Sequence, residues 1–253
     1  MDLDLGNRVY LVTGASRGLG FAAAQVLVSE GARVVIVSRD DVAVTRAAHE
    51  LGSDRAVGLA EDIAKSGAAE RMVAAAVARF GRLDGALISV GGPPPASAMD
   101  ATDDQWRSAF ESVFLGALRT TRAVAAALGD GGSICLVLSS SVRSPIGNLA
   151  ISNGLRPGLA MTAKTLADEL GPRGVRVNGL LPGRIATERI RELDTLGSGD
   201  AESARTRNSQ GIPLRRYGEP AEFGRVAAFL LSPAASYLTG VMLPVDGGAL
   251  RCL

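Results

Sequence analysis

Short apolar runs alternate with longer segments of helical pattern along almost the whole chain. Several of these runs are apolar without alternation, which is typical of parallel strands buried on both faces. Helical stretches separate most of them, so the order is strand, helix, strand. This order predicts an α/β domain with a doubly wound parallel sheet of about seven strands and helices on both faces. The expected strands are Val9–Thr13, Arg33–Ser38, Ala56–Ala60, Gly85–Val90, Ser133–Leu138, Val175–Leu181 and Gly240–Val245.

The longest helical pattern runs from Thr102 to Leu128. Thr102 and Gln105 have the spacing of a capping box, and the two aspartates between them suit the positive end of a helix dipole. Apolar residues then recur at helical spacing until Gly129, which is typical of a helix end. We expect the apolar stripe of this helix to be buried in the core, in a subunit interface, or in both.

Two segments lack such periodicity. Residues 91–98 are rich in glycine and proline, and Leu193–Gln210 is rich in glycine, serine and charged residues. The second segment follows the sixth predicted strand, on the side of the sheet where ligands bind in such folds. A loose segment of this length is a lid or is disordered, and we favour a mobile substrate lid over residues 186–212. No linker divides the chain, so residues 1–253 are expected to form a single domain.

Composition and charge exclude several classes of function. The chain has 253 residues, 47% of them hydrophobic, and a net charge of +1, so nothing indicates binding to nucleic acid or to a membrane surface. The first residues are acidic and no apolar run suits a leader or a membrane span, so we expect a cytoplasmic protein with a small-molecule substrate. Two cysteines cannot form a disulfide framework, and His49, on a polar helix, is the only histidine, so no metal site is expected.

Residues 8–20, Arg-Val-Tyr-Leu-Val-Thr-Gly-Ala-Ser-Arg-Gly-Leu-Gly, carry the strongest indication of chemistry. An apolar strand leads directly into a glycine turn, and the turn leads into an Ala-rich helix. Gly14 permits a backbone conformation that other residues resist, while Gly18 and Gly20 remove side chains where a phosphate and the strand come close. The free N–H groups and the positive dipole end of the helix favour a pyrophosphate. The turn therefore predicts a dinucleotide site.

With Thr13 in front, the Gly-x-x-x-Gly-x-Gly spacing resembles the motif of the short-chain dehydrogenase/reductase family. Further matches are Asp62-Ile63, Asn178, Pro182-Gly183 followed by Thr187, and Asp246-Gly247-Gly248. The resemblance implies a Rossmann-like fold and a homo-oligomer, a tetramer or a dimer, built on two long helices. The cofactor-binding residues that it implies are Thr13, Gly14, Ser16, Arg17, Gly18, Leu19, Gly20, Ser38, Arg39, Asp62, Ile63, Gly91, Arg156, Pro182, Gly183 and Thr187.

The end of the second predicted strand indicates which dinucleotide binds. Family members that prefer NAD carry an acidic residue there, which accepts a hydrogen bond from the ribose 2′-hydroxyl, but this chain has Ser38. Arg39 follows, and Arg17 lies within the glycine turn. Two guanidinium groups suit a 2′-phosphate, because arginine binds phosphate with paired donors. We therefore predict NADP(H), with Asp40 one position too late to act as the acid.

The resemblance also implies a catalytic tetrad, of which this chain retains one member. Ser139 matches the serine that hydrogen-bonds the substrate carbonyl. Ser152 occupies the place of the tyrosine, Arg156 that of the lysine, and Val113 that of the asparagine. A phenol, whose pKa is about 10, can be tuned toward neutrality, whereas an alkanol starts several units higher and needs a strong base beside it. Arg156 stays protonated, so it can hold a ribose hydroxyl or stabilise an oxyanion but cannot act as a base.

Pro157 follows directly after this position. Inside a regular helix a proline lacks an N–H and clashes with an earlier carbonyl, so we expect the helix either to begin later than in family members or to kink. Polar side chains between the fifth strand and this helix either line a substrate pocket or cap the helix and its loop; they are Ser140, Ser141, Arg143, Asn148 and Asn153. The candidate catalytic residues are Ser139, Ser152, Arg156, Arg143 and Asn153.

Three functions fit this pattern. The favoured one is an NADP(H)-dependent oxidoreductase acting on a carbonyl or hydroxyl group, in which Ser139 and Arg156 polarise the carbonyl and water supplies the proton. The chain resembles a divergent, 3-oxoacyl-reductase-like branch of the family that lacks the Tyr-x-x-x-Lys motif. The alternatives are a non-redox enzyme on the same scaffold, such as a dehydratase, isomerase or cyclase, and a non-catalytic NADP(H)-binding or partner subunit.

Overall fold

A sheet of seven parallel strands lies at the centre of the computed structural model, which describes residues 2–198 and 200–252. The strand order is β3-β2-β1-β4-β5-β6-β7, and every neighbouring pair is parallel. The predicted doubly wound sheet is therefore confirmed, and the predicted strand ends lie within two residues of the observed ones. The strands are β1 Val9–Thr13, β2 Arg33–Ser38, β3 Ala56–Ala60, β4 Gly85–Ile88, β5 Ser133–Val137, β6 Arg176–Pro182 and β7 Met242–Val245.

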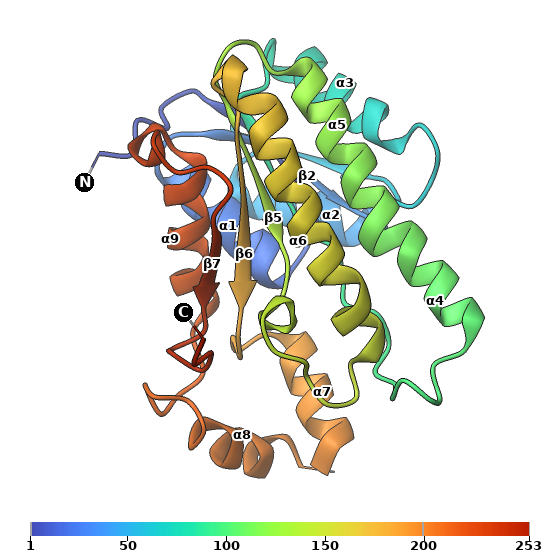
Figure 1. The fold of residues 1–253 in the computed structure, drawn as a ribbon. Helices are drawn as coiled ribbons and strands as arrows, with labels where there is room; N and C mark the ends of the chain where they lie inside the picture. Colours follow the sequence, from blue (N-terminus) through green and yellow to red (C-terminus); the bar gives the residue numbers. More distant parts are fainter. Residues whose placement is uncertain (1, 199, 253) are drawn as a thin grey trace.

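Helices cover both faces of the sheet (Figure 1). They are α1 Gly18–Ser29, α2 Asp41–Leu51, α3 Ala68–Phe80, α4 Asp103–Ala109, the π-helix η1 Phe110–Gly116, α5 Ala117–Ala127, η2 Ser140–Val142, α6 Ala150–Leu170, η3 Gly171–Arg173, α7 Glu188–Ser198, α8 Ala201–Ser209, α9 Pro220–Leu231 and η4 Pro233–Ala235. α1, α2 and α9 pack on one face, and α3, α5 and α6 pack on the other. α7 and α8 lie beyond the carboxyl end of β6, at the bottom of Figure 1. Within the described ranges, no helix is both long and apolar enough to cross a membrane.

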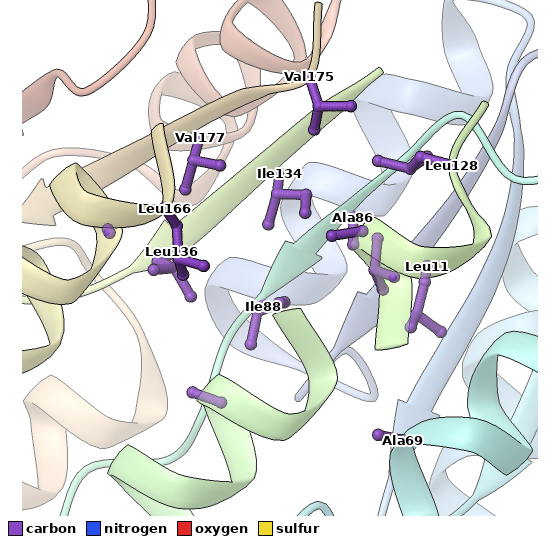
Figure 2. Close-up of a cluster of buried hydrophobic side chains, with 14 of the residues drawn as sticks. Leu11, Ala69, Ala86, Ile88, Leu128, Ile134, Leu136, Leu166, Val175 and Val177 are labelled. Atoms are coloured by element: carbon purple, nitrogen blue, oxygen red, sulfur yellow. The ribbon is translucent and has the colours of Figure 1, made fainter. Parts of the chain in front are cut away.

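The sheet divides the core in two, because successive residues of a strand face opposite sides. In β1, Leu11 lies with the side chains under α3, α5 and α6, whereas Tyr10 and Val12 lie with those under α1 and α9. Figure 2 shows Ile88 of β4 and Ile134 of β5 in the first of these clusters. Full burial of each such side chain stabilises the fold by about 1.5–3 kcal/mol. The strands whose ends carry the site are therefore packed against a buried cluster on each face of the sheet.

The helix predicted over residues 102–128 begins as expected but changes form along its length. Both hydrogen bonds of the predicted capping box are present, at 3.2 and 2.9 Å. The chain is α-helical in α4, widens to the π-helix η1, and returns to an α-helix in α5. Gly116 in the wider turn lies against the backbone of Ile63, where a Cβ would come 2.7 Å from the carbonyl oxygen. The π-helix thus coincides with a tertiary contact that helical periodicity does not encode.

The prediction that Leu193–Gln210 is loose is wrong, because most of this segment forms α7 and α8. A buried polar cluster, rather than an apolar stripe, fixes the two helices. Asp194 of α7 accepts hydrogen bonds from Arg184 at 2.6 Å and from Tyr217 at 2.9 Å. Asn208 of α8 donates to the same carboxylate at 3.1 Å. Hydrophobic periodicity cannot reveal a cluster of this kind, so the sequence pattern missed both helices.

α6 runs through Pro157 as one helix. It begins at Ala150, before Ser152 and Arg156, so of the two predicted effects of Pro157 the structure does not show a delayed start of the helix. The missing N–H of the proline costs the helix one backbone hydrogen bond near its first turns, where tertiary contacts hold the chain. Ser152 and Arg156 are four residues apart and therefore share one face of α6.

Candidate active site

The carboxyl ends of β1 and β4 form the centre of the site. The strand order reverses between them, and ligands bind at such a switch point in open α/β sheets. Thr13 ties the two strand ends together, since its hydroxyl donates to the Ser89 carbonyl at 2.7 Å and accepts from the Ser89 N–H at 2.9 Å. Gly14 follows with a φ of +59°, and a Cβ there would lie 2.7 Å from the same carbonyl oxygen. The turn therefore requires glycine.

The glycine turn leaves the start of α1 open to an anion. Arg17, the N-cap residue, makes no capping hydrogen bond with its side chain, and the first turn of α1 carries no acidic residue. A Cβ on Gly20 would lie 2.5 Å from the Gly14 carbonyl oxygen, so the turn closes tightly only without a side chain there. Ser16 and Leu19, both half-buried, complete the turn. The unpaired N–H groups and the positive helix end fit the pyrophosphate of a dinucleotide.

The end of β2 carries an exposed guanidinium, Arg39, next to an aspartate that caps the following helix. Ser38 donates to the Asp40 carbonyl at 3.1 Å, and the Asp40 carboxylate caps α2 by accepting the N–H of Ala43 at 3.0 Å. Arg39 is exposed, and no ion pair joins it to another residue in the described part of the chain. Because Asp40 is engaged by its own helix, this strand end is suited to a phosphate rather than to a ribose hydroxyl.

The other predicted cofactor residues lie around the same strand ends. Asp62 accepts the backbone N–H two residues further on at 3.0 Å. Gly91 has open space beside it, since a Cβ there would meet nothing within 4 Å. Thr187, just before α7, brings its methyl group within 3.9 Å of the Cβ position of Gly18. In this parallel sheet the carboxyl ends of β3, β4 and β6 lie at the same edge as the glycine turn; the predicted cofactor residues that follow them are Asp62, Ile63, Gly91, Pro182, Gly183 and Thr187.

Arg156 is buried at the carboxyl ends of β4 and β5. Its Nη1 donates to the Val137 carbonyl at 2.8 Å and its Nη2 to the Val90 carbonyl at 3.4 Å. Burial lowers the pKa of the guanidinium from 12.5 to about 10, so it remains protonated at neutral pH. In the described ranges, no carboxylate lies within ion-pair distance of it. The site therefore has a buried positive charge whose hydrogen bonds, among the described residues, go to backbone carbonyls.

Three serines lie on the segments that carry Arg156 and its partner Val137: Ser139 and Ser141 follow β5, and Ser152 is on the same face of α6 as Arg156. The Oγ atoms of Ser152 and Ser141 are 3.3 Å apart, and both residues are buried. The Ser139 oxygen accepts the N–H of Ser141 at 3.1 Å, which caps η2. Ser152 is thus hydrogen-bonded to Ser141 rather than to Ser139. The sequence placed Ser141 among the polar residues of this region but gave no sign that it contacts Ser152, because η2 alone sets that geometry.

Arg143 and Asn153 bind backbone groups in the structure. Arg143 reaches β7, where its Nη2 donates to the Met242 carbonyl at 3.1 Å. The Asn153 amide accepts the N–H of Ile146 at 3.1 Å and donates to the carbonyl of the same residue at 2.9 Å. For Asn153 this geometry matches the expectation that it holds the loop before α6. Both side chains therefore shape the site from outside the group of serines around Arg156.

The chain matches the family model described as enoyl-(acyl carrier protein) reductase over residues 14–249. It belongs to the short-chain dehydrogenase/reductase (SDR) family. It is 34% identical over 244 residues to the short-chain reductase protein NovJ of Streptomyces niveus, covering 95% of this chain and 93% of NovJ. Human dehydrogenase/reductase SDR family member 4 is 35% identical over 250 residues, covering 96% of this chain and 88% of that protein.

Solved SDR structures superpose on the whole chain. The L-sorbose reductase of Gluconobacter frateurii, complexed with NADPH and L-sorbose, is 29% identical and covers 100% of both chains with a TM-score of 0.93. A glucose/ribitol dehydrogenase-type SDR from Brucella melitensis is also 29% identical over 100% of both chains, with a TM-score of 0.92. The Rossmann-like fold expected from the glycine motif is thus confirmed.

This SDR chain has no phenol at its site, because all three of its tyrosines lie elsewhere. Tyr10 donates to the Leu231 carbonyl in the core under α1 and α9, and burial raises its pKa. Tyr217 belongs to the polar cluster of α7 and α8, and Tyr237 is fully exposed. Lys164 donates to the Gly240 carbonyl at 2.9 Å. The described residues also contain no group of His, Cys, Asp and Glu side chains that could hold a metal ion.

Two residues of α7 that the sequence did not single out reach across this SDR site. The Glu188 carboxylate pairs with the guanidinium of Arg17 in the glycine turn. The next residue, Arg189, donates to the Pro93 carbonyl at 2.8 Å, in the loop that follows β4. Their partners are 171 and 96 positions away in the sequence, so no local pattern could have revealed either contact.

Proposed function

We propose that this SDR chain is an NADP(H)-dependent oxidoreductase that acts on a carbonyl or hydroxyl group with a non-standard active site. The observation that carries the proposal is Arg156, a buried guanidinium that contacts the last residue of β5 and the segment following β4. Arg17 and Arg39 at the other end of the site are suited to a 2′-phosphate. The similar L-sorbose reductase, which was solved with NADPH, supports the same cofactor.

When bound, the dinucleotide supplies or accepts a hydride. The Ser139 oxygen accepts the Ser141 N–H, which leaves its hydroxyl proton to donate to a substrate carbonyl oxygen. The positive charge of Arg156 favours the negative charge that develops on that oxygen, and it acts in a buried place where water screens little. Ser152 is an alkanol without a base beside it, so it is a poor proton donor at neutral pH. The proton therefore comes from water.

Calorimetric titration of the purified protein with NADPH and with NADH is the first test. We expect NADPH to bind at least tenfold more tightly than NADH, because two guanidinium groups serve the 2′-phosphate. Carbonyl compounds are then screened as substrates with NADPH, and their reduction is monitored by the loss of nicotinamide absorbance. Absence of binding by both dinucleotides contradicts the proposal, whereas NADPH binding with hydride transfer supports it.

The lack of a phenol favours a second candidate, a non-catalytic NADP(H)-binding subunit. The double substitution Ser152→Tyr and Arg156→Lys separates the two functions, because it restores the motif that the family uses. Turnover that appears or rises in the double variant indicates that the scaffold still presents a reductase pocket. NADPH binding without turnover in either protein favours the second candidate. Ser152→Phe with Arg156→Lys is the control, since it adds a ring without the hydroxyl.

The proposal also assigns a role to residues 186–212 and an oligomeric state to the protein. α7 and α8 lie beyond the carboxyl end of β6, so we propose that they form the substrate lid of a single domain of residues 1–253. Met161 on α6 and Phe110 at the start of η1 are exposed apolar side chains, which suits the predicted homo-oligomer. The cytoplasmic location stays a prediction.

A further inference from the structure

An ion pair joins the glycine turn to the start of α7. Arg17 at the N-cap of α1 donates through Nη1 to the Glu188 carboxylate. Both side chains are largely exposed, at 72% for Arg17 and 68% for Glu188. Close to this pair, Thr187 lies 3.9 Å from the Cβ position of Gly18, so α7 begins directly beside the turn. The carboxylate of Glu188 is therefore held at the edge of the expected phosphate site.

Arg17 is also one of the two guanidinium groups suited to the 2′-phosphate of NADP(H). A guanidinium binds a phosphate best with two parallel donors, and a carboxylate already bonded to Nη1 occupies part of that fork. Arg39, the second such group, has no ion-pair partner in the described ranges, so it needs no release. Only Arg17 has to exchange one anion for another when NADP(H) binds.

Glu188 belongs to a helix that is packed against its neighbours, rather than to a loop. Glu188 is the first residue of α7, and the Asp194 carboxylate of the same helix is buried among Arg184, Tyr217 and Asn208. That cluster fixes α7 to α8 and to the segment after β6. Glu188 therefore keeps its place near Arg17 without further ordering, which makes it an effective competitor for the guanidinium.

We propose that Glu188 weakens the preference of this protein for NADP(H) over NAD(H), by competing with the 2′-phosphate of NADP(H) for Arg17. The inference rests on the proposed use of NADP(H). A phosphate carries more negative charge than a carboxylate, so the phosphate wins Arg17, but part of its binding free energy is lost in breaking the ion pair. NADH does not need Arg17 for a 2′-hydroxyl, so its affinity does not depend on Glu188. Glu188 thus reduces the difference between the affinities for NADPH and NADH.

The test is a calorimetric comparison of wild-type protein with Glu188→Gln, using NADPH and NADH. An exposed ion pair changes an equilibrium by up to about fivefold, so we expect NADPH to bind roughly two- to fivefold more tightly to the variant. The NADH affinity should stay unchanged. Glu202→Gln, on α8, is the control for net charge and should alter neither affinity, because Glu202 is exposed and forms no ion pair in the described ranges. Thermal unfolding of each variant checks that the fold is retained.

A double-mutant cycle shows whether the effect passes through Arg17. In an Arg17→Gln background, Glu188→Gln should leave the NADPH affinity unchanged, whereas in an Arg39→Gln background the two- to fivefold gain should persist. An equal gain for NADH, or a gain that survives the loss of Arg17, overturns the proposal, because Glu188 then repels the whole dinucleotide. NADPH binding that Glu188→Gln does not change overturns this inference alone. Absence of NADPH binding by the wild type overturns the proposed function as well.

Discussion

Arg156→Met separates the functional role of the buried guanidinium from its effect on stability. Burial lowers the pKa of Arg156 from 12.5 to about 10, so its charged form is disfavoured in the folded protein. The difference of 2.5 pKa units corresponds to about 3 kcal/mol. Because the folded-state pKa is the lower one, this penalty is fully present at neutral pH and disappears only as the pH rises from about 10 to 12.5. Methionine, of similar length and uncharged, removes the penalty.

The substitution also removes two hydrogen bonds. The bond to the Val137 carbonyl is short, at 2.8 Å, and a bond from a charged donor contributes about 1.5–3 kcal/mol. The bond to the Val90 carbonyl, at 3.4 Å, is weaker. The loss is therefore of the same size as the relieved penalty and opposite in sign. We expect the free energy of unfolding of Arg156→Met to change by no more than about 1 kcal/mol, or a shift in Tm of up to about 4 °C.

Urea unfolding and NADPH calorimetry are the two assays for this variant. Loss of a charged donor to the cofactor should weaken NADPH binding by about 10- to 100-fold, while stability stays close to that of the wild type. Arg176→Met is the matched control: its guanidinium donates to the carbonyls of Leu230 and Ser232 at the end of α9, away from the site. It should lose stability and keep its NADPH affinity. A loss of 3 kcal/mol or more in Arg156→Met, with unchanged NADPH binding, would show that Arg156 is a structural residue.

Three further predictions follow from the close contacts and the cysteines. Gly14→Ala places a Cβ 2.7 Å from a backbone carbonyl at a φ of +59°, so NADPH calorimetry should show no binding, and urea unfolding a loss of about 1–3 kcal/mol. Gly154→Ala brings a Cβ within 2.7 Å of the Trp106 ring and should cost about 1–3 kcal/mol in the same unfolding assay, whereas an unchanged midpoint would show that the ring moves aside freely. Cys135 is fully buried and its pKa is raised to about 12, so a thiol reagent should label only the exposed Cys252 until denaturant is added.

The sheet could be read from the sequence because its signal is local and strong. Parallel strands buried on both faces are continuous apolar runs, and their ends fell within two residues of the predicted ones. α7 and α8 could not be read in this way, because the Asp194 cluster that fixes them consists of polar groups from four separate segments. The π-helix η1 has the same explanation, since Gly116 meets the Ile63 backbone only in the folded chain.

In the candidate site, too, some features could be predicted from the sequence and others could not. The glycine turn was predictable because the spacing of its glycines is itself local, and Gly20 lies against the Gly14 carbonyl six residues earlier, although the contact of Gly14 with Ser89 is not local. Side-chain directions were not predictable. The Asn153 amide holds the backbone of Ile146, and Arg17 bonds to a carboxylate far along the chain. Sequence spacing assigns a residue to a helix face, but the partner it finds depends on loops whose course the spacing does not encode.

Ser152 and Arg156, which the resemblance assigns to the places of the family's tyrosine and lysine, form an arrangement whose polar groups are satisfied. A large side chain lost from a buried polar site leaves donors or acceptors without partners, and each such group costs about 1–3 kcal/mol. Within the described ranges, no buried side-chain nitrogen or oxygen lacks a hydrogen-bond partner. Ser152 is satisfied by Ser141, and Arg156 spans the ends of β4 and β5. Because the burial penalty of Arg156 and its hydrogen bonds nearly cancel, stability alone gives no reason for a buried cation without an acid beside it, whereas a ligand that uses the charge does. The buried guanidinium of Arg156, rather than the absence of a phenol, is therefore the feature to test first for function.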